Sequence, residues 1–340
     1  MRQISNDCLK EYVTGAVYFK EDDDGLIPYR FSEEKLVSTK GNLRREIRHY
    51  GAAGIRVDFF SDTEKLHFGF TAYTGFSCKT ENYNLYFFDV YVDNELILHQ
   101  GEKNLSTDIA GVISLKLKPG LKRITIYLPA PCSVKISDFY IDKQACMNKV
   151  EYSQKALFLG DSITHAAYLD FPSLNYANII ARRFNYHSVN QAIGGDVFDK
   201  KHLLYTSDFK PDIIFVAYGT NDWRGATTNE NCIENVDAYF RELTSLYDKA
   251  EINVILPIWR KDKNDYPELK YSFIEVRNMI REVAEKYDAH VLDGMDFVPQ
   301  SERMFWDGYL HPNEMGFLYY ADSLESWINK ISKGSEKQVR

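Results

Sequence analysis

Ser162 lies at a position where a side chain could carry out chemistry. It follows the apolar run ALFL at 156–159 and the break at Gly160-Asp161. A short apolar run that ends at glycine predicts a buried parallel strand leading into a turn and a helix. Such turns, at the carboxyl ends of strands, are where open α/β sheets place their sites. Ser162 is therefore a candidate nucleophile, with the alternative that it only forms the N-cap of the next helix.

A serine hydroxyl becomes a useful nucleophile only when a base lies within reach. His311, in the segment DGYLHPN at 307–313, is the candidate base. Asp307 is the candidate carboxylate that holds its imidazole ring. His311 could instead be only a helix-entry residue, and Asp293 is a weaker substitute for Asp307.

The oxyanion that forms during acyl transfer needs preorganised hydrogen-bond donors. Three candidates are the backbone N–H groups of Ser162 and Gly195 and the side-chain amide of Asn221. Gly195 lies in the segment IGGD at 193–196, where a missing Cβ lets the backbone approach a substrate. Taken alone, this glycine predicts only a tight turn. Asn221, taken alone, predicts only a side chain that stabilises its loop through hydrogen bonds of the amide.

Strands and helices alternate after residue 155, and these elements would position the candidate residues. Helical stripes of apolar residues begin at Ile233, Leu269 and Met315. The predicted strands cover 156–161, 187–192, 212–219, 253–259 and 290–293. This alternation predicts a parallel sheet covered by helices on both faces, so that segments after different strands meet at one edge.

The first half of the chain has the period of two that is typical of strands. Apolar and other residues alternate over 66–70, 113–117 and 124–128, with a turn signal at 119–120. These short strands predict an antiparallel β-sandwich. The segment 40–50 is interpreted as strand or loop. The aromatic residues of this half could bind sugar, but core packing explains them and favours a half that shapes the neighbouring cleft.

Composition and charge exclude several classes of protein. The chain has 340 residues, enough for two domains, and a net charge of −8. Residues 1–150 hold 20 basic and 20 acidic residues, and residues 151–340 hold 21 and 29. Neither half has the basic surplus of a nucleic-acid-binding protein, and the acidic second half disfavours polyanionic substrates.

Apolar runs and cysteines in the sequence indicate the compartment of the protein and its relation to membranes. The first residues contain no apolar signal segment, and no apolar run is long enough to span a bilayer. The five cysteines are scattered and odd in number, which indicates reduced thiols and a cytoplasmic protein rather than a disulfide or zinc framework.

The blocks GDSIT, IGGD, GTND and D…HPN, in this order, resemble those of the SGNH hydrolases, or GDSL esterase/lipase superfamily. The resemblance covers about 156–330. It implies Ser162 as nucleophile, Gly195 and Asn221 as oxyanion donors, His311 as base, a flavodoxin-like three-layer α/β/α fold and no metal or other cofactor. A β-sandwich before such a domain is similar to family-two carbohydrate acetyl esterases. We expect a jelly-roll-like sandwich domain at 1–148 and the hydrolase domain at 149–335.

One departure from the family concerns the spacing of the Asp and the His. The family separates the two by two residues, whereas three lie between Asp307 and His311. Either Gly308 absorbs the additional residue and Asp307 still reaches the ring, or a backbone carbonyl orients the imidazole. We expect the Asp307 carboxylate to reach the ring of His311 and orient it.

Residues near the strand ends and near His311 are expected to contact the substrate. His165, three residues after Ser162, is expected at the rim of the site rather than as a second base. The expected substrate-binding residues are Asp196, Trp223, Trp259, Arg260 and Trp306.

These patterns predict a serine esterase that removes a short acyl group, an acetyl group, from a carbohydrate. The expected partner is a small-molecule or oligosaccharide ester, with no nucleic acid and no membrane. The alternatives are a lysophospholipase or acyl-thioesterase acting on longer acyl chains, and a carbohydrate-binding protein that has lost its chemistry.

Overall fold

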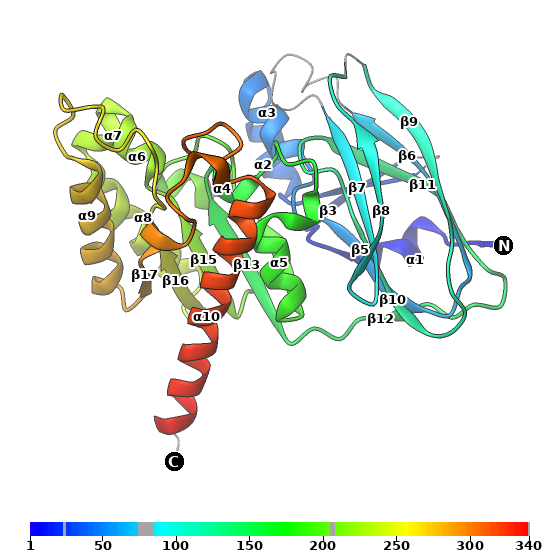
Figure 1. Cartoon of the computed structure of the whole chain (residues 1–340). Coiled ribbons are helices and arrows are strands. Elements are labelled where there is room, and N and C mark those ends of the chain that lie inside the picture. Colours follow the sequence, from blue (N-terminus) through cyan, green and yellow to red (C-terminus); the bar gives the residue numbers. More distant parts are fainter. Residues whose placement is uncertain (23–24, 74–84, 106, 205–207, 339–340) are drawn as a thin grey trace.

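Two antiparallel sheets form most of the N-terminal half, residues 1–150 (Figure 1). The computed structural model describes residues 1–22, 25–73, 85–105, 107–204 and 208–338. One sheet contains β3 (Tyr18–Asp22), β4 (Gly25–Tyr29), β11 (Ser133–Ile141), β6 (Lys65–Tyr73) and β9 (Ile109–Lys116), in this order, with β1 (Arg2–Gln3) beside β11. The other contains β12 (Asn148–Lys149), β5 (Arg56–Ser61), β10 (Lys122–Tyr127), β7 (Tyr86–Val92) and β8 (Glu95–Glu102), with β2 (Val13–Thr14) beside β5.

Alternate side chains of these strands form the core of the N-terminal half. Phe68 and Phe70 of β6 contact Phe88 of β7 in the other sheet, with ring centroids 5.9 and 4.7 Å apart. All three side chains are buried. The predicted alternation is therefore confirmed, because one face of each sheet meets the other sheet.

Three helices of the N-terminal half are α1 (Asn6–Lys10), α2 (Glu33–Ser38) and α3 (Leu43–Tyr50). The interpretation of 40–50 as strand or loop is wrong, since α3 occupies most of it. Asn42 caps this helix by accepting a hydrogen bond from the Arg45 N–H at 3.2 Å. Ile47 packs against Ala167 of the C-terminal half. Leu43, Ile47 and Tyr50 stand at i, i+4 and i+7, so the helical spacing is present, but over only two turns it is too short to stand out in the sequence.

The C-terminal half, residues 151–340, contains a parallel sheet of five strands. These are β13 (Gln154–Gly160), β14 (Tyr186–Asn190), β15 (Ile213–Ala217), β16 (Glu251–Ile255) and β17 (His290–Leu292). Their spatial order is β14-β13-β15-β16-β17, and each neighbouring pair is parallel. This is the flavodoxin-like order, in which sites lie beyond the carboxyl ends of the strands. The predicted fold class is confirmed.

Helices cover both faces of the parallel sheet (Figure 1). Ala156 and Phe158 of β13 pack toward α5 (Tyr176–Arg183) and α10 (Glu314–Gln338). Leu157 and Leu159 pack toward α8 (Cys232–Leu246) and α9 (Phe273–Lys286). The short helices α4 (Ser162–His165), α6 (Thr220–Arg224) and α7 (Ala226–Glu230) follow strand ends or one another. No helix of the described residues is long and apolar enough to cross a bilayer.

A capping box explains why α9 begins later than its apolar stripe. The Ser272 side chain accepts from the Glu275 N–H, and the Glu275 carboxylate accepts from the Ser272 N–H. Leu269, which the stripe includes, therefore lies before the helix.

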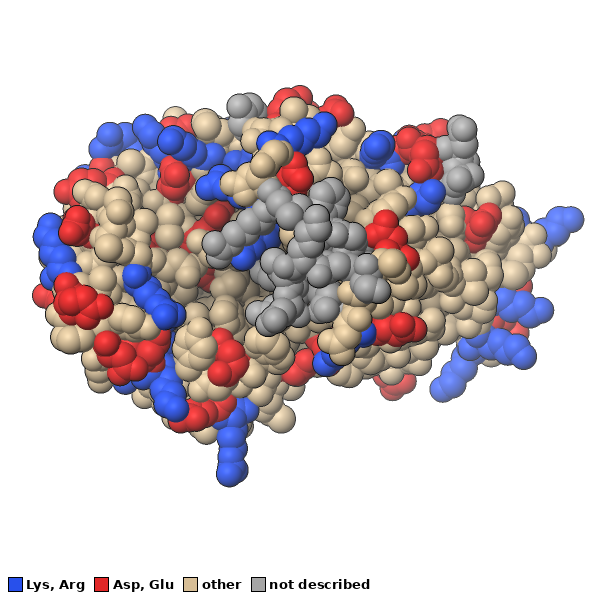
Figure 2. Space-filling view, turned by 90° about the horizontal axis from the view of Figure 1, so that it is seen from above, with Lys and Arg blue, Asp and Glu red and all other residues tan. Residues whose placement is uncertain are grey.

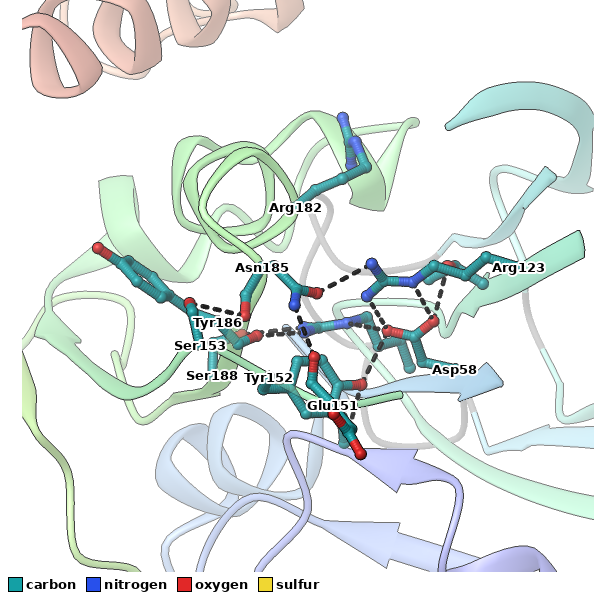
Figure 3. A network of polar contacts seen from close by, with 12 residues as sticks. Asp58, Arg123, Glu151, Tyr152, Ser153, Arg182, Asn185, Tyr186 and Ser188 are labelled. Atoms are coloured by element: carbon teal, nitrogen blue, oxygen red, sulfur yellow. Dashed lines mark hydrogen bonds and ion pairs between the residues drawn. The ribbon is translucent and has the colours of Figure 1, made fainter. Parts of the chain in front are cut away.

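A buried polar network joins the two halves (Figure 3). Asp58 of β5 accepts hydrogen bonds from Arg123 at 2.9 and 2.7 Å and from the Tyr152 hydroxyl at 2.8 Å. Arg123 also donates to the Asn185 side chain at 2.9 Å, in the segment before β14. Arg56 donates to Ser188 of β14 at 2.9 Å. Charged side chains of the N-terminal sheet thus find hydrogen-bond partners in the C-terminal half, and these bonds hold the two halves together.

We expect Asp58→Ala to lower the free energy of unfolding by about 3–5 kcal/mol, because it leaves two arginines without their buried carboxylate. Burial acts to raise the pKa of Asp58, but its hydrogen bonds with Arg123 and the charges of Arg56 and Arg123 lower it. The stabilisation is therefore present above the unfolded-state pKa of about 3.9 and lost as the pH falls through the lower folded-state pKa. Urea unfolding at pH 7 measures the difference.

Asp322→Ala is the matched control, because Asp322 pairs with Arg183 at the surface, with side chains 62% and 32% exposed. Its expected cost is below about 1 kcal/mol. If both variants lost the same free energy of unfolding, the buried network would not be the more important of the two sets of contacts.

Candidate active site

Ser162, His311 and Asp307 lie in one chain of hydrogen bonds, although 145 residues separate the first from the last. Ser162 Oγ is 2.8 Å from His311 Nε2, and His311 Nδ1 is 2.6 Å from Asp307 Oδ2. An ionised carboxylate can only accept, so Nδ1 carries the proton and Nε2 of the neutral ring accepts from the serine. This is the arrangement in which a histidine can take the hydroxyl proton.

The loop at 307–311 accommodates the three-residue spacing. Gly308 has a φ of +77°, in the left-handed region that favours glycine. Asp307 Oδ1 accepts the backbone N–H groups of Tyr309, Leu310 and His311 at 3.1, 2.9 and 3.1 Å. One carboxylate oxygen therefore closes the turn and the other holds the imidazole.

The surroundings of Asp307 keep it ionised. Burial acts to raise its pKa, but the hydrogen bond with His311 and the backbone N–H groups of the turn outweigh it, and the pKa is about 2. Asp293 lies elsewhere, paired with Arg277 and Arg281. The structure brings Asp307, and not Asp293, to the ring.

Asp161 caps the helix that Ser162 begins. The Asp161 side chain accepts from the Ile163 N–H at 3.0 Å, as the N-cap of α4. The Ser162 hydroxyl is directed to His311 instead. Gly160 is required just before, because a Cβ there would lie 2.4 Å from Thr164 Oγ1. Because Asp161 is the N-cap, Ser162 does not serve as one.

The candidate oxyanion donors Gly195 and Asn221 line the same pocket as Ser162. Gly195 has a φ of +83°, and the turn around it closes with the Asp196 N–H donating to the Ile193 carbonyl at 3.1 Å. The Asn221 amide donates to the Asp196 carbonyl at 2.9 Å. That bond orients one amide N–H and leaves the second N–H of the amide for another acceptor.

The N-terminal half holds the segment that leads to Gly195. The buried Arg30 guanidinium donates to the carbonyl oxygens of Asn190 and Ala192 at 2.7 and 2.8 Å. It also donates to the carbonyls of Gly51 and Arg48 at 2.8 and 2.6 Å. One arginine therefore ties the end of β14 to the end of α3.

A second arginine acts on the glycine turn itself. Arg48 of α3 donates to the Gly194 carbonyl. His165 lies on the other side, with its Nδ1 3.3 Å from the Gly194 nitrogen. His165 is fully buried, so the expectation that it lies at the rim is wrong.

The pocket above Ser162 is open to solvent and has a volume of about 240 Å³. Its aromatic wall is formed by Tyr168, whose ring is 4.9 Å from the His311 ring, and by Trp306, whose ring is 5.6 Å from Tyr168. Trp306 is 50% exposed and lies where the sequence predicts it. The other lining residues are Arg48, Gly194, Gly195, Asn221, Arg224, Tyr309, Leu310 and His311.

Two residues expected to contact the substrate are buried, one on the core side of α6 and one beside the start of that helix. Trp223 is 1% exposed and packs on Phe273, with ring centroids 5.2 Å apart. Arg260 is also 1% exposed. Its guanidinium donates to both carboxylate oxygens of Asp262 at 2.6 and 2.8 Å, and to the Thr220 carbonyl at 3.0 Å. Arg260 thus braces the start of the helix that carries Asn221, and neither residue lines the pocket.

Trp259 and Asp196 also lie outside the pocket. Trp259 is buried against Phe305, with ring centroids 5.3 Å apart, because the chain turns inward after β16. The Asp196 side chain faces away, 3.5 Å from His202 and beside Lys35. Burial raises the pKa of Asp196 to about 7. Only the backbone carbonyl of Asp196 serves the site, through Asn221.

Several residues of the pocket were missed by sequence reasoning, among them Arg224, Tyr168 and Arg48. Arg224 lies three residues after Asn221 on α6, and this helical spacing could have revealed it. Tyr168 follows a turn after α4, where Ala166 has a φ of +47°. Arg48 comes from the N-terminal half, and nothing in its sequence neighbourhood relates it to Ser162.

Part of the chain resembles a known family in sequence. Residues 158–317 match the GDSL-like Lipase/Acylhydrolase family model, which confirms the resemblance seen in the four blocks. No curated protein sequence matches the chain.

Solved structures share the whole architecture. The salicylyl-acyltransferase of a tetracycline biosynthetic pathway superposes with a TM-score of 0.81 at 20% identity, covering 94% of each chain. A family-two carbohydrate esterase from Clostridium thermocellum, in complex with cellohexaose, has a TM-score of 0.65 at 15% identity, covering 94% of this chain and 99% of the other. An acetyl xylan esterase from Butyrivibrio proteoclasticus has a TM-score of 0.64 at 14% identity, covering 98% and 100%. At these identities the likeness shows the fold.

Proposed function

Residues 158–317 belong to the GDSL-like lipase/acylhydrolase family, and we propose that the chain is a serine esterase that removes a short acyl group, an acetyl group, from a carbohydrate. The observation that carries this proposal is the hydrogen-bonded chain from Ser162 through His311 to Asp307, opening into a pocket. The family agrees with the predicted enzyme class, a carboxylic ester hydrolase.

In the first half of the reaction, Ser162 Oγ attacks the ester carbonyl carbon while His311 Nε2 takes the hydroxyl proton. The negative charge moves to the carbonyl oxygen, where the N–H groups of Ser162 and Gly195 and the Asn221 amide are the proposed donors. The tetrahedral intermediate then collapses. The sugar hydroxyl leaves with the proton from His311, and the acyl group stays on Ser162.

The second half repeats these steps with water. His311 takes a proton from a water molecule, which attacks the acyl-enzyme carbonyl. Collapse of the second intermediate returns the proton to Ser162 and releases the carboxylic acid. The imidazolium formed in each half is stabilised by the ionised Asp307, whose pKa of about 2 keeps its charge at neutral pH.

A carbohydrate is proposed as the alcohol part because of the aromatic wall at the mouth. Trp306 is half exposed and parallel to Tyr168 within 29°, and flat aromatic rings suit the apolar faces of sugars. The carbohydrate esterases of similar fold support the same choice.

We expect the rate of p-nitrophenyl ester hydrolysis to be highest for acetate in a series from two to ten acyl carbons, because the described residues that line the pocket offer polar donors and form no long apolar groove. Acetic acid released from acetylated oligosaccharides is measured in parallel. A maximum at eight carbons or more would favour the lysophospholipase or acyl-thioesterase alternative. No hydrolysis, together with no labelling of Ser162 by a fluorophosphonate, would favour a binding protein.

The domain division at 1–148 and 149–335 stays a prediction, as does the cytoplasmic location. β12 (Asn148–Lys149) still pairs with β5 of the N-terminal half, and β13 begins at Gln154, so the predicted boundary falls within β12, five residues before the parallel sheet begins. Cys8, Cys132, Cys146 and Cys232 are free thiols, and Cys78 lies outside the described residues.

A further inference from the structure

The pocket above Ser162 differs in charge from the rest of the chain. The chain has a net charge of −8, and Figure 2 shows acidic and basic side chains intermixed over the face on the side of α3, α6 and α7. Of the described residues that line the pocket, two are arginines, Arg48 and Arg224, and none is Asp or Glu. An uncharged sugar ester does not require two guanidinium groups beside its reacting carbonyl.

Arg224 is held in place but keeps hydrogen-bonding capacity. Its guanidinium lies 4.9 Å from the ring centre of Tyr266, and its side chain is 45% exposed. Its ion pair with Asp262 is long, at 3.8 Å, beyond the length of a hydrogen bond. Both oxygens of Asp262 instead accept from Arg260. A stacked guanidinium with donors left over is preorganised to bind a carboxylate through two parallel hydrogen bonds.

Arg48 adds a second positive charge next to the glycine turn. It lines the pocket while donating to the Gly194 carbonyl. Arg224 ends the short helix that carries Asn221. Arg224 thus shares a helix with the proposed donor Asn221, and Arg48, on α3, is hydrogen-bonded to the residue before the proposed donor Gly195.

We propose that the substrate carries a carboxylate, bound by Arg224 in the positive potential that Arg48 reinforces, and that it is an acylated acidic sugar such as a uronic acid. This inference rests on the proposed esterase function. An acetyl group has no charge, so the carboxylate lies in the sugar part. The acidic character of the C-terminal half does not oppose this, because the potential inside a pocket depends most on the charged groups that line it.

The test compares release of acetate from two acetyl esters that differ at the sugar carboxyl group, an acetylated methyl glucuronoside, which is an anion, and its neutral methyl ester. In the wild type at low ionic strength we expect kcat/KM to be about tenfold or more higher for the anion, the size of a hydrogen bond to a charged group. Arg224→Met is expected to bring the ratio close to one. Arg224→Lys is expected to keep part of the preference, since charge remains but the planar fork is lost. Added salt should lower the wild-type ratio.

Arg241→Met is the matched control, because Arg241 is exposed on α8 and pairs with Asp237. It should leave the ratio unchanged. The dissociation constants of both intact esters for the Ser162→Ala protein, measured by calorimetry, test the carboxylate site without turnover. Equal kcat/KM and equal affinity for the two esters, or a preference that survives in Arg224→Met, would overturn the inference. If the wild type hydrolyses neither ester, the esterase proposal fails, while the affinities still decide whether the pocket selects the carboxylate.

Discussion

Replacing Ser162 with alanine is expected to lower kcat for p-nitrophenyl acetate by about 10⁶-fold, the loss typical of removing the nucleophile from a Ser-His-Asp enzyme. Without Oγ no acyl-enzyme can form, and His311 has no hydroxyl proton to take. The remaining donors at Gly195 and Asn221 would still polarise the ester, so a small rate above that of water should persist. A stopped assay with p-nitrophenyl acetate measures both rates.

Ser301→Ala is the control for this prediction. Ser301 is exposed and has no side-chain role as a cap, so wild-type activity is expected. Thermal unfolding of both variants checks that the fold is intact. A Ser162→Ala protein that hydrolyses the ester at the wild-type rate would remove Ser162 from the mechanism.

Replacing Asp307 with asparagine is expected to lower kcat by about 10⁴-fold, because an amide N–H cannot accept the proton of His311 Nδ1. The ring would then adopt the tautomer whose Nε2 carries a proton and cannot act as base. The asparagine oxygen can still accept the three backbone N–H groups of the turn, so the loop is expected to keep its shape. The difference between this variant and the wild type isolates the orientation of the imidazole.

The pH dependence of the Asp307→Asn loss is a further part of the same measurement. Since the pKa of Asp307 is about 2, the wild-type carboxylate is ionised at all pH values from about 4 upward. Titration of Asp307 itself should therefore contribute nothing to the pH dependence of the fold loss over that range. Asp322→Asn, at an exposed carboxylate, should have wild-type activity. A loss of less than about tenfold in Asp307→Asn would support the alternative in which a backbone carbonyl orients His311.

The parallel sheet and the residues next to its strand ends could be predicted because they depend on local patterns. Strand β13 is a continuous apolar run because both of its faces are buried. The right-handed crossover rule then brings the ends of such strands to one edge. Gly195 and Asn221 lie at that edge for the same reason.

The burial of Trp223, Trp259 and Arg260 was not visible in the same patterns. Position after a strand indicates that a residue is near the site, but not which way its side chain points. On α6, Asn221 and Arg224 share the face that lines the pocket, whereas Trp223 faces the core. A rotation of one or two residues along a helix decides between the two.

By itself, the sequence determined the fold of the C-terminal half, the alternating strands of the N-terminal half, and Ser162, His311 and Asp307 as candidates, because local periodicity and glycine turns carry that information. Only the tertiary structure decided how the imidazole is held, through the two oxygens of Asp307. It also decided that Arg48, from α3, reaches the pocket. Contacts between segments more than a hundred residues apart depend on the packing of the two halves, which no local pattern encodes.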